Sequence, residues 1–113
     1  MHVLILCQFG MNRSVHLQKY LESKGYSASA GGVLQDKKDV QDKIDFADVI
    51  VTVHPEVEDS LRQQFNIGSA RVIALNVDDR PKNGPLEGTA WTEYQQRNVY
   101  GKLEAQMDQY LPL

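Results

Sequence analysis

The chain alternates short runs rich in apolar residues with longer stretches in which apolar residues recur every three or four positions. The short runs cover residues 2–6, 26–30, 49–53 and 72–77. Runs of this kind predict short strands that are covered on both faces. The longer stretches cover residues 14–24, 36–46, 56–65 and 89–110. They predict amphipathic helices; in one of them, Val57, Leu61 and Phe65 stand four residues apart.

This order of elements predicts an α/β fold. Strands that alternate with helices form a parallel sheet through right-handed crossovers, with helices on both faces. We expect a three-layer domain whose four strands lie in the order 2-1-3-4, with a ligand crevice at their carboxyl ends. Gly25, the pair Gly31-Gly32 and Pro55 stand where these elements are expected to begin or end. Because no repeat or linker interrupts the pattern, residues 1–113 are expected to form one domain.

Charge and composition narrow the classes of function. The net charge is −3, and Lys and Arg are mixed with Asp and Glu, so we expect no nucleic-acid partner. No run reaches the roughly 18 apolar residues that cross a bilayer. A soluble, cytoplasmic protein without a membrane partner is therefore expected. The single cysteine, Cys7, has no partner for an internal disulfide and is either a packing residue or a reactive thiol.

The stretch LILCQFGMNRS places Cys7 at the carboxyl end of the first expected strand, shortly before Arg13 and Ser14. A backbone that curls from this strand into the next helix directs successive N–H groups inward, where they and the helix dipole bind a phosphate. Gly10 supplies the left-handed conformation for the curl, and Asn12 also tolerates it. Arg13 can bind two phosphate oxygens, and Ser14 can donate a hydrogen bond to the sulfur. In such a loop the sulfur is expected to be a thiolate at neutral pH.

The stretch VLILCQFGMNRS resembles the phosphate loop of the low-molecular-weight protein tyrosine phosphatases, whose signature is Cys, five residues and Arg-Ser. The segments SAG at residues 29–31 and ADVIVTV at residues 47–53, and an acidic loop after the last strand, follow in the order of that family. The NRS form of the loop and the later SKGY are also similar to the related phosphatases that act on the C-terminal repeats of RNA polymerase II. The resemblance implies a four-stranded parallel sheet with flanking helices, and phosphatase activity.

The chain departs from the family at three places. Asn12 stands where typical members have a second cysteine, and Val15 replaces a frequent proline. The Asp-Pro pair that carries the family's general acid is absent, so Asp78 and Asp79 in NVDDRPKNGPLEG become the candidates. The alignment favours Asp79, with Asp78 a close alternative, while a purely turn-forming role for both is the other interpretation. His54 ends the third expected strand and can lie at the mouth of the pocket, although a solvated position before Pro55 is the favoured interpretation.

These features predict a cysteine-dependent phosphatase that needs no cofactor. Cys7 attacks phosphorus, and Asp79 or Asp78 protonates the leaving group. Together with Arg13, the residues expected to bind the phosphate oxygens are Gln8, Phe9, Gly10, Met11 and Asn12. The expected substrate is a phosphorylated protein, with phosphotyrosine favoured, or a small phosphate monoester. No spacing of histidines and cysteines predicts a metal site. The alternatives are a non-catalytic phosphate-binding module and a phosphocarrier resembling the IIB component of sugar phosphotransferase systems.

Overall fold

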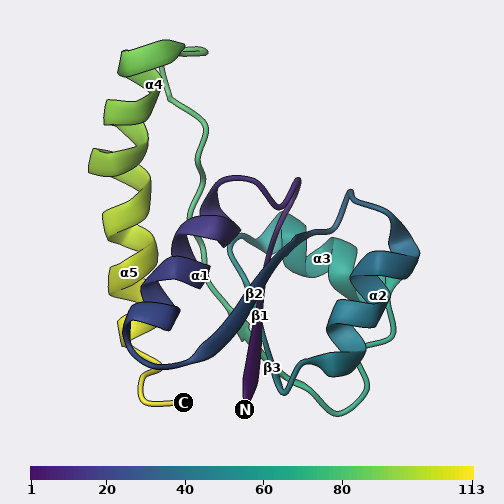
Figure 1. The fold of residues 1–113 in the computed structure, drawn as a ribbon. Helices are drawn as coiled ribbons and strands as arrows, with labels where there is room; N and C mark the ends of the chain where they lie inside the picture. The colour runs from purple at the N-terminus through teal and green to yellow at the C-terminus, as the bar shows by residue number, and fades with distance from the viewer.

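The computed structural model describes all 113 residues and alternates strands with helices from end to end (Figure 1). The strands are β1 (His2–Cys7), β2 (Ser27–Gly32), β3 (Val49–Thr52) and β4 (Arg71–Ala74). The α-helices are α1 (Arg13–Ser23), α2 (Lys37–Phe46), α3 (Pro55–Gln64), α4 (Gly88–Gln95) and α5 (Gly101–Asp108). A π-helical segment, η1 (Gln96–Tyr100), joins α4 to α5 in one continuous rod.

The four strands form one parallel sheet in the order β2-β1-β3-β4, which confirms the predicted topology. The strand β1 is central, and its last residue, Cys7, lies opposite Gly32 of β2. On the other side, Leu6 lies opposite Thr52 of β3. The carboxyl end of β1 is therefore flanked by the carboxyl ends of two other strands, the place where a parallel sheet forms a crevice.

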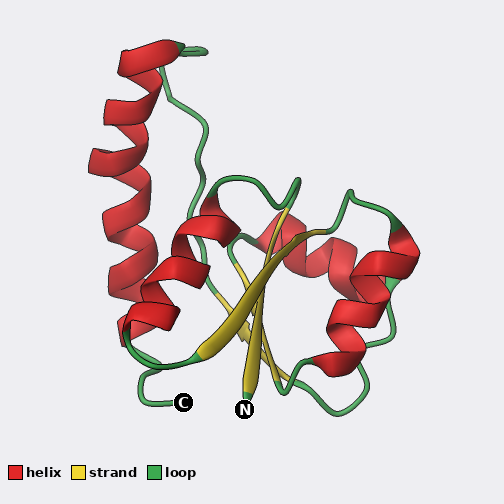
Figure 2. Ribbon diagram, viewed as in Figure 1, coloured by secondary structure: helices red, strands yellow, loops and turns green.

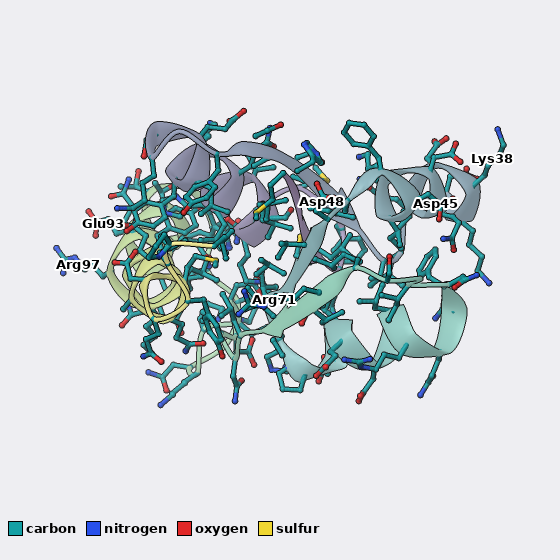
Figure 3. All side chains as sticks on the ribbon, turned by 90° about the horizontal axis from the view of Figure 1, so that it is seen from below. Lys38, Asp45, Asp48, Arg71, Glu93 and Arg97 are labelled. Carbon is teal, nitrogen blue, oxygen red and sulfur yellow. The ribbon has the colours of Figure 1, made fainter.

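Helices cover both faces of the sheet, as Figure 2 shows. The helix α1 and the rod formed by α4, η1 and α5 cover one face, and α2 and α3 cover the other. Charged side chains point outward from these helices, among them Glu93 and Arg97 on the rod and Lys38 on α2 (Figure 3). The sheet is thus buried between two helical layers, as the apolar strand pattern requires.

The buried apolar residues form one core of 23 side chains that spans the sheet and both helical layers. Residues Val3, Leu4, Ile5 and Leu6 of β1 have no exposed surface, because helices cover both sides of this central strand. The unbroken apolar run at the start of the chain follows from this position. None of the helices has the length and apolar character needed to cross a membrane.

The observed element boundaries differ from the predicted ones by a residue or so at most elements, and more clearly at three of them. The strand β2 extends through Gly32, two residues further than predicted. The strand β4 ends at Ala74, although the amides of Leu75 and Val77 still donate hydrogen bonds to carbonyls at the end of β3. The predicted helix over residues 89–110 is interrupted by the π-helical turn of η1, which apolar periodicity alone does not reveal.

Truncation of the core is expected to be costly, whereas the same change at the surface is not. Leu4 is fully buried in β1, so Leu4→Ala is expected to lower the free energy of unfolding by about 2–5 kcal/mol. Leu34 is 58% exposed, and Leu34→Ala should change it by no more than about 0.5 kcal/mol. Urea denaturation measures both. Similar losses for the two variants would contradict the burial described here.

Candidate active site

The loop of residues 8–12 connects β1 to α1 at the carboxyl edge of the sheet. Gly10 has a φ of +72°, the left-handed conformation that the curl of this loop requires. A side chain at Gly10 would also lie 2.9 Å from the backbone nitrogen of Gly32. Asn12 has a φ of −125°, so it does not use the left-handed region that it tolerates. Gly10 alone therefore turns the chain.

The sulfur of Cys7 receives two hydrogen-bond contacts from its own loop and helix. The amide of Gly10 donates to Cys7 Sγ at 3.1 Å, and the hydroxyl of Ser14 lies 3.0 Å from the same sulfur. Ser14 is completely buried in the first turn of α1. The sulfur therefore lies against one backbone donor and one hydroxyl that can donate to it.

A cavity of about 400 Å³ opens above this sulfur. It is lined by Cys7, Gln8, Phe9, Met11, Asn12, Arg13, Asp79 and Arg80. The amides of Phe9, Met11 and Asn12 donate no hydrogen bond within the protein and remain free for a ligand. The structure thus brings nearly all the predicted site residues around one hollow, with Gly10 and Ser14 directly beneath it at the sulfur.

The guanidinium of Arg13 is held rigidly at the side of this cavity. Arg13 is only 5% exposed, and its Nη1 donates a hydrogen bond of 2.6 Å to the carbonyl of Val77. Its Nε lies 3.4 Å from Asp79 Oδ2, close enough for an ion pair, yet this buried nitrogen has no hydrogen-bond partner. A buried donor without a partner is energetically costly, and an anion in the cavity would satisfy it.

The two candidate acids lie in different surroundings. The carboxylate of Asp79 is 29% exposed and lines the cavity beside Arg13. The carboxylate of Asp78 does not line it and instead binds Arg80, whose Nη2 donates to Asp78 Oδ2 at 2.8 Å. This hydrogen bond with Arg80 is the main cause that lowers the pKa of Asp78 to about 2. Asp78 is therefore a stable anion that braces the loop.

The rod of α4, η1 and α5 holds the backbone of the acidic loop by side-chain hydrogen bonds. Gln95 Nε2 donates to the carbonyl of Asp79 at 2.9 Å, and Tyr94 Oη donates to the carbonyl of Arg80 at 3.2 Å. Further along, the carboxamide of Gln106 both accepts from the amide of Asn76 and donates to its carbonyl. The position of Asp79 is thus set by the C-terminal part of the chain.

Asn12 joins the loop of residues 8–12 to the acidic loop. Its Nδ2 donates to Asp79 Oδ2 at 3.2 Å and to Gln95 Oε1 at 2.9 Å, while its Oδ1 accepts from Tyr100 Oη at 2.5 Å. The sequence analysis missed Gln95 and Tyr100. One feature of the sequence could have indicated Gln95: it is a polar residue four positions before Val99, in the apolar stripe of the expected helix.

The site residues and the fold can now be compared with known proteins. No protein-family model matches the chain, and no curated protein matches it. Among solved structures, the solution structure of a low molecular weight protein tyrosine phosphatase from Bacillus subtilis matches with a TM-score of 0.60 at 16% sequence identity. The match covers 98% of this chain and 97% of that chain. The chain has the fold of a low molecular weight protein tyrosine phosphatase.

In this phosphatase fold, the phosphate loop packs directly on the end of β2, a feature that the sequence analysis also missed. A side chain at Gly32 would lie 2.4 Å from the carbonyl carbon of Phe9 and 2.5 Å from the nitrogen of Gly10. Gln35 adds two hydrogen bonds, accepting from the amide of Gly32 and donating to the carbonyl of Phe9, both at 2.9 Å. Close packing of β2 therefore fixes the outer side of the loop.

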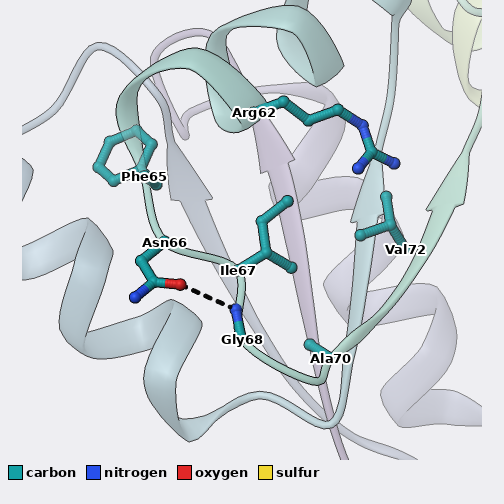
Figure 4. A pocket seen from close by; sticks show the side chains of 7 residues that line it. All are labelled: Arg62, Phe65, Asn66, Ile67, Gly68, Ala70 and Val72. Carbon is teal, nitrogen blue, oxygen red and sulfur yellow. Dashed lines mark hydrogen bonds between the residues drawn. The ribbon is translucent and has the colours of Figure 1, made fainter.

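His54 and Asp78 line a small hollow beside this cavity, and the two hollows share Gln8, Arg13, Asp79 and Arg80. A larger hollow of about 590 Å³ lies between the end of α3 and the start of β4 (Figure 4). It is at the amino end of β4, opposite the edge that carries Cys7, and Arg62 is its only titratable residue. His54 caps α3 by accepting from the amide of Glu56. No group of three or more His, Cys, Asp or Glu side chains is arranged to hold a metal ion.

The close approach at Gly32 gives a direct test of the loop's packing. Gly32→Ala is expected to lower the free energy of unfolding by about 1–3 kcal/mol, because the added methyl group overlaps backbone atoms of Phe9 and Gly10. Gly101→Ala is the matched control: its methyl group has no neighbour within 4 Å, and alanine is favoured over glycine in a helix by about 1 kcal/mol. Chemical denaturation measures both changes. Equal stability of the two variants would show that the loop does not rest on Gly32.

Proposed function

We propose that the protein is a cysteine-dependent phosphatase that hydrolyses phosphate monoesters through a phosphocysteine intermediate. One juxtaposition carries the proposal. Two hydrogen-bond donors contact Cys7 Sγ, and the buried Arg13 Nε, which has no hydrogen-bond partner, lies in the same cavity. The contacts at the sulfur suit a nucleophile, and the unpartnered guanidinium nitrogen suits binding of an oxyanion.

In the first step, the thiolate of Cys7 attacks phosphorus in line with the ester oxygen. The S–P bond forms while the P–O bond to the leaving group breaks, and the leaving oxygen takes a proton from the carboxyl group of Asp79. Arg13 and the free amides of the loop bind the equatorial phosphate oxygens, where negative charge is spread in the transition state. A seated phosphate also replaces the Asp79 carboxylate as the partner of Arg13 Nε.

In the second step, water hydrolyses the intermediate. The carboxylate of Asp79 takes a proton from the attacking water, the new P–O bond forms, and the S–P bond breaks to release inorganic phosphate. The sulfur leaves as a thiolate, and the hydroxyl of Ser14, 3.0 Å away, stabilises the charge that returns to it. The enzyme is then in its starting state, with no other reactant consumed.

Asp79 is the acid in this proposal because of where its carboxyl group lies. It lines the cavity that contains Cys7, whereas the carboxylate of Asp78 is held by Arg80 and has a lowered pKa. The carboxylate of Asp78 is paired with Arg80 outside the cavity and is not placed to donate a proton there. The geometry therefore supports Asp79 over Asp78.

The rim of the cavity supports an aromatic phosphate monoester as substrate. Phe9 is 61% exposed and Met11 is 78% exposed, and both belong to the loop after β1 and line the cavity. A flat ring attached to the phosphate would lie against these two side chains, which suits phosphotyrosine in a protein. A phosphate-binding module without activity remains the competing function, and turnover distinguishes the two.

Three aspartate-to-asparagine variants and one cysteine variant test this mechanism. Cys7→Ser should abolish hydrolysis of para-nitrophenyl phosphate, and Asp79→Asn should lower kcat by about 100-fold or more on phenyl phosphate, the loss typical of a missing general acid. Asp78→Asn is expected to lower kcat on phenyl phosphate far less. Asp59→Asn, on the exposed side of α3, is the matched control and should match the wild type. An inert wild-type protein that still binds phosphate would establish the binding module instead.

Occupancy of the cavity by phosphate should protect Cys7 from alkylation. Because Cys7 is the only cysteine, iodoacetamide labelling followed by mass spectrometry reports on this sulfur alone. We expect millimolar phosphate to slow labelling of the wild type. The protection should be lost in Arg13→Lys, since an ammonium cannot reproduce the planar guanidinium, and retained in Arg97→Lys on the outer side of the rod. If phosphate does not change the labelling rate of Cys7 in the wild type, the proposed anion site is wrong.

A further inference from the structure

The C-terminal rod contacts the site through two polar side chains to which the proposed mechanism gives no role. Gln95 ends α4 and is completely buried, and Tyr100 ends η1 and is half-buried. Both form hydrogen bonds with Asn12, which in turn contacts the carboxylate of Asp79. The argument that follows rests on the proposed phosphatase function and concerns how its acid is positioned.

The π-helical turn explains how one rod presents both side chains to Asn12. In an α-helix with 3.6 residues per turn, residues five apart are separated by about 140° around the axis. Gln95 and Tyr100 are five residues apart and would face different directions. A π-helical turn closes over five residues, so these two side chains come onto the same face. Such turns are rare and are frequently found at functional sites.

Both the oxygen and the nitrogen of the Gln95 carboxamide form hydrogen bonds. Its Oε1 accepts from Asn12 Nδ2 at 2.9 Å, and its Nε2 donates to the carbonyl of Asp79 at 2.9 Å. It therefore bridges the phosphate loop and the acidic loop at the base of the acid. Gln95 lies in the same row as Val99 and Leu103, where an apolar side chain would fill the space equally well. A glutamine at this buried position is explained by its hydrogen bonds to the two loops.

Tyr100 is itself held in place. Its ring stacks on the imidazole of His16 with centroids 4.1 Å apart and planes 3° apart, and His16 Nε2 lies 2.8 Å from Glu104 Oε2. Burial, and secondarily the charge of Asp79, raise the pKa of Tyr100. Its hydroxyl thus stays a donor, and it fixes Asn12 Oδ1 so that the amide nitrogen of Asn12 faces Asp79.

We propose that Gln95 and Tyr100 are positioning residues that hold Asn12 against Asp79 and so aim the acid at the leaving oxygen. They act through Asn12 and the acidic loop and do not touch the phosphate. Their contribution therefore belongs to protonation of the leaving group and not to binding of the phosphate.

The basicity of the leaving group separates these two contributions. Para-nitrophenolate is a weak base and leaves with little help from an acid, whereas unsubstituted phenolate is a stronger base and needs the proton. Both substrates place the same phosphate in the same loop. A residue that positions the acid is therefore more important for phenyl phosphate, and a residue that merely supports the fold affects both substrates alike.

The variants are Gln95→Leu, which keeps the buried volume, and Tyr100→Phe, which keeps the ring that stacks on His16. We expect each to lower kcat on phenyl phosphate at least 10-fold more than on para-nitrophenyl phosphate, with KM nearly unchanged. In Asp79→Asn, which already lacks the acid, adding either change should cause no further selective loss. Thermal unfolding of each variant confirms that it is folded.

Two matched controls carry the same chemical changes away from Asn12. Gln96→Leu alters the exposed glutamine next to Gln95, and Tyr110→Phe alters an exposed tyrosine whose only hydrogen bond is from its backbone amide. Both should keep the wild-type ratio of the two activities. Equal losses on the two substrates in Gln95→Leu and Tyr100→Phe, or no loss at all, would overturn the positioning role while leaving the phosphatase intact. A wild-type protein that hydrolyses neither substrate would overturn the proposed function itself, and the positioning role with it.

Discussion

The buried guanidinium of Arg13 is the interaction on which the site depends. It belongs to α1, yet its Nη1 is bound to the carbonyl of Val77 and its Nε faces the carboxylate of Asp79. One side chain therefore ties the loop after β1 to the loop after β4, across the intervening strand β3. Because a guanidinium is planar and always charged, it fixes the separation of the two loops and leaves a donor directed at the space between them.

The sheet makes this arrangement possible. In a parallel sheet with β1 at the centre, the carboxyl ends of all strands lie on one edge, so segments far apart in the sequence meet there. The apolar core below this edge holds the strands in register. Four polar side chains are buried, and three of them, Arg13, Ser14 and Gln95, contact the site; the fourth is Thr52 of β3.

The parts of this structure that follow from local pattern were predictable from the sequence. Apolar runs and helical periodicity indicated the strands, the helices and their order, and the glycine after Cys7 indicated a curled loop between β1 and α1. The contribution of Gly32 was not predictable, because it depends on how closely β2 approaches the phosphate loop in three dimensions. Gln95 and Tyr100 were missed for a similar reason. Their common orientation exists only because the helix widens at η1, and an apolar stripe gives no sign of such a turn.

The π-helical turn also affects which insertions, deletions and substitutions the rod can accept. A five-residue turn contains more residues than an α-helical turn of 3.6, so it rotates α4 relative to α5 about their shared axis. The later half can then pack Leu103 and Met107 into the core while the earlier half faces the acidic loop. Loss of a single amino acid between positions 96 and 100 would restore regular α-helical winding and bring these two halves out of phase. Deletions in this short stretch are therefore expected to be tolerated less well than substitutions at its exposed positions, Gln96, Arg97 and Asn98.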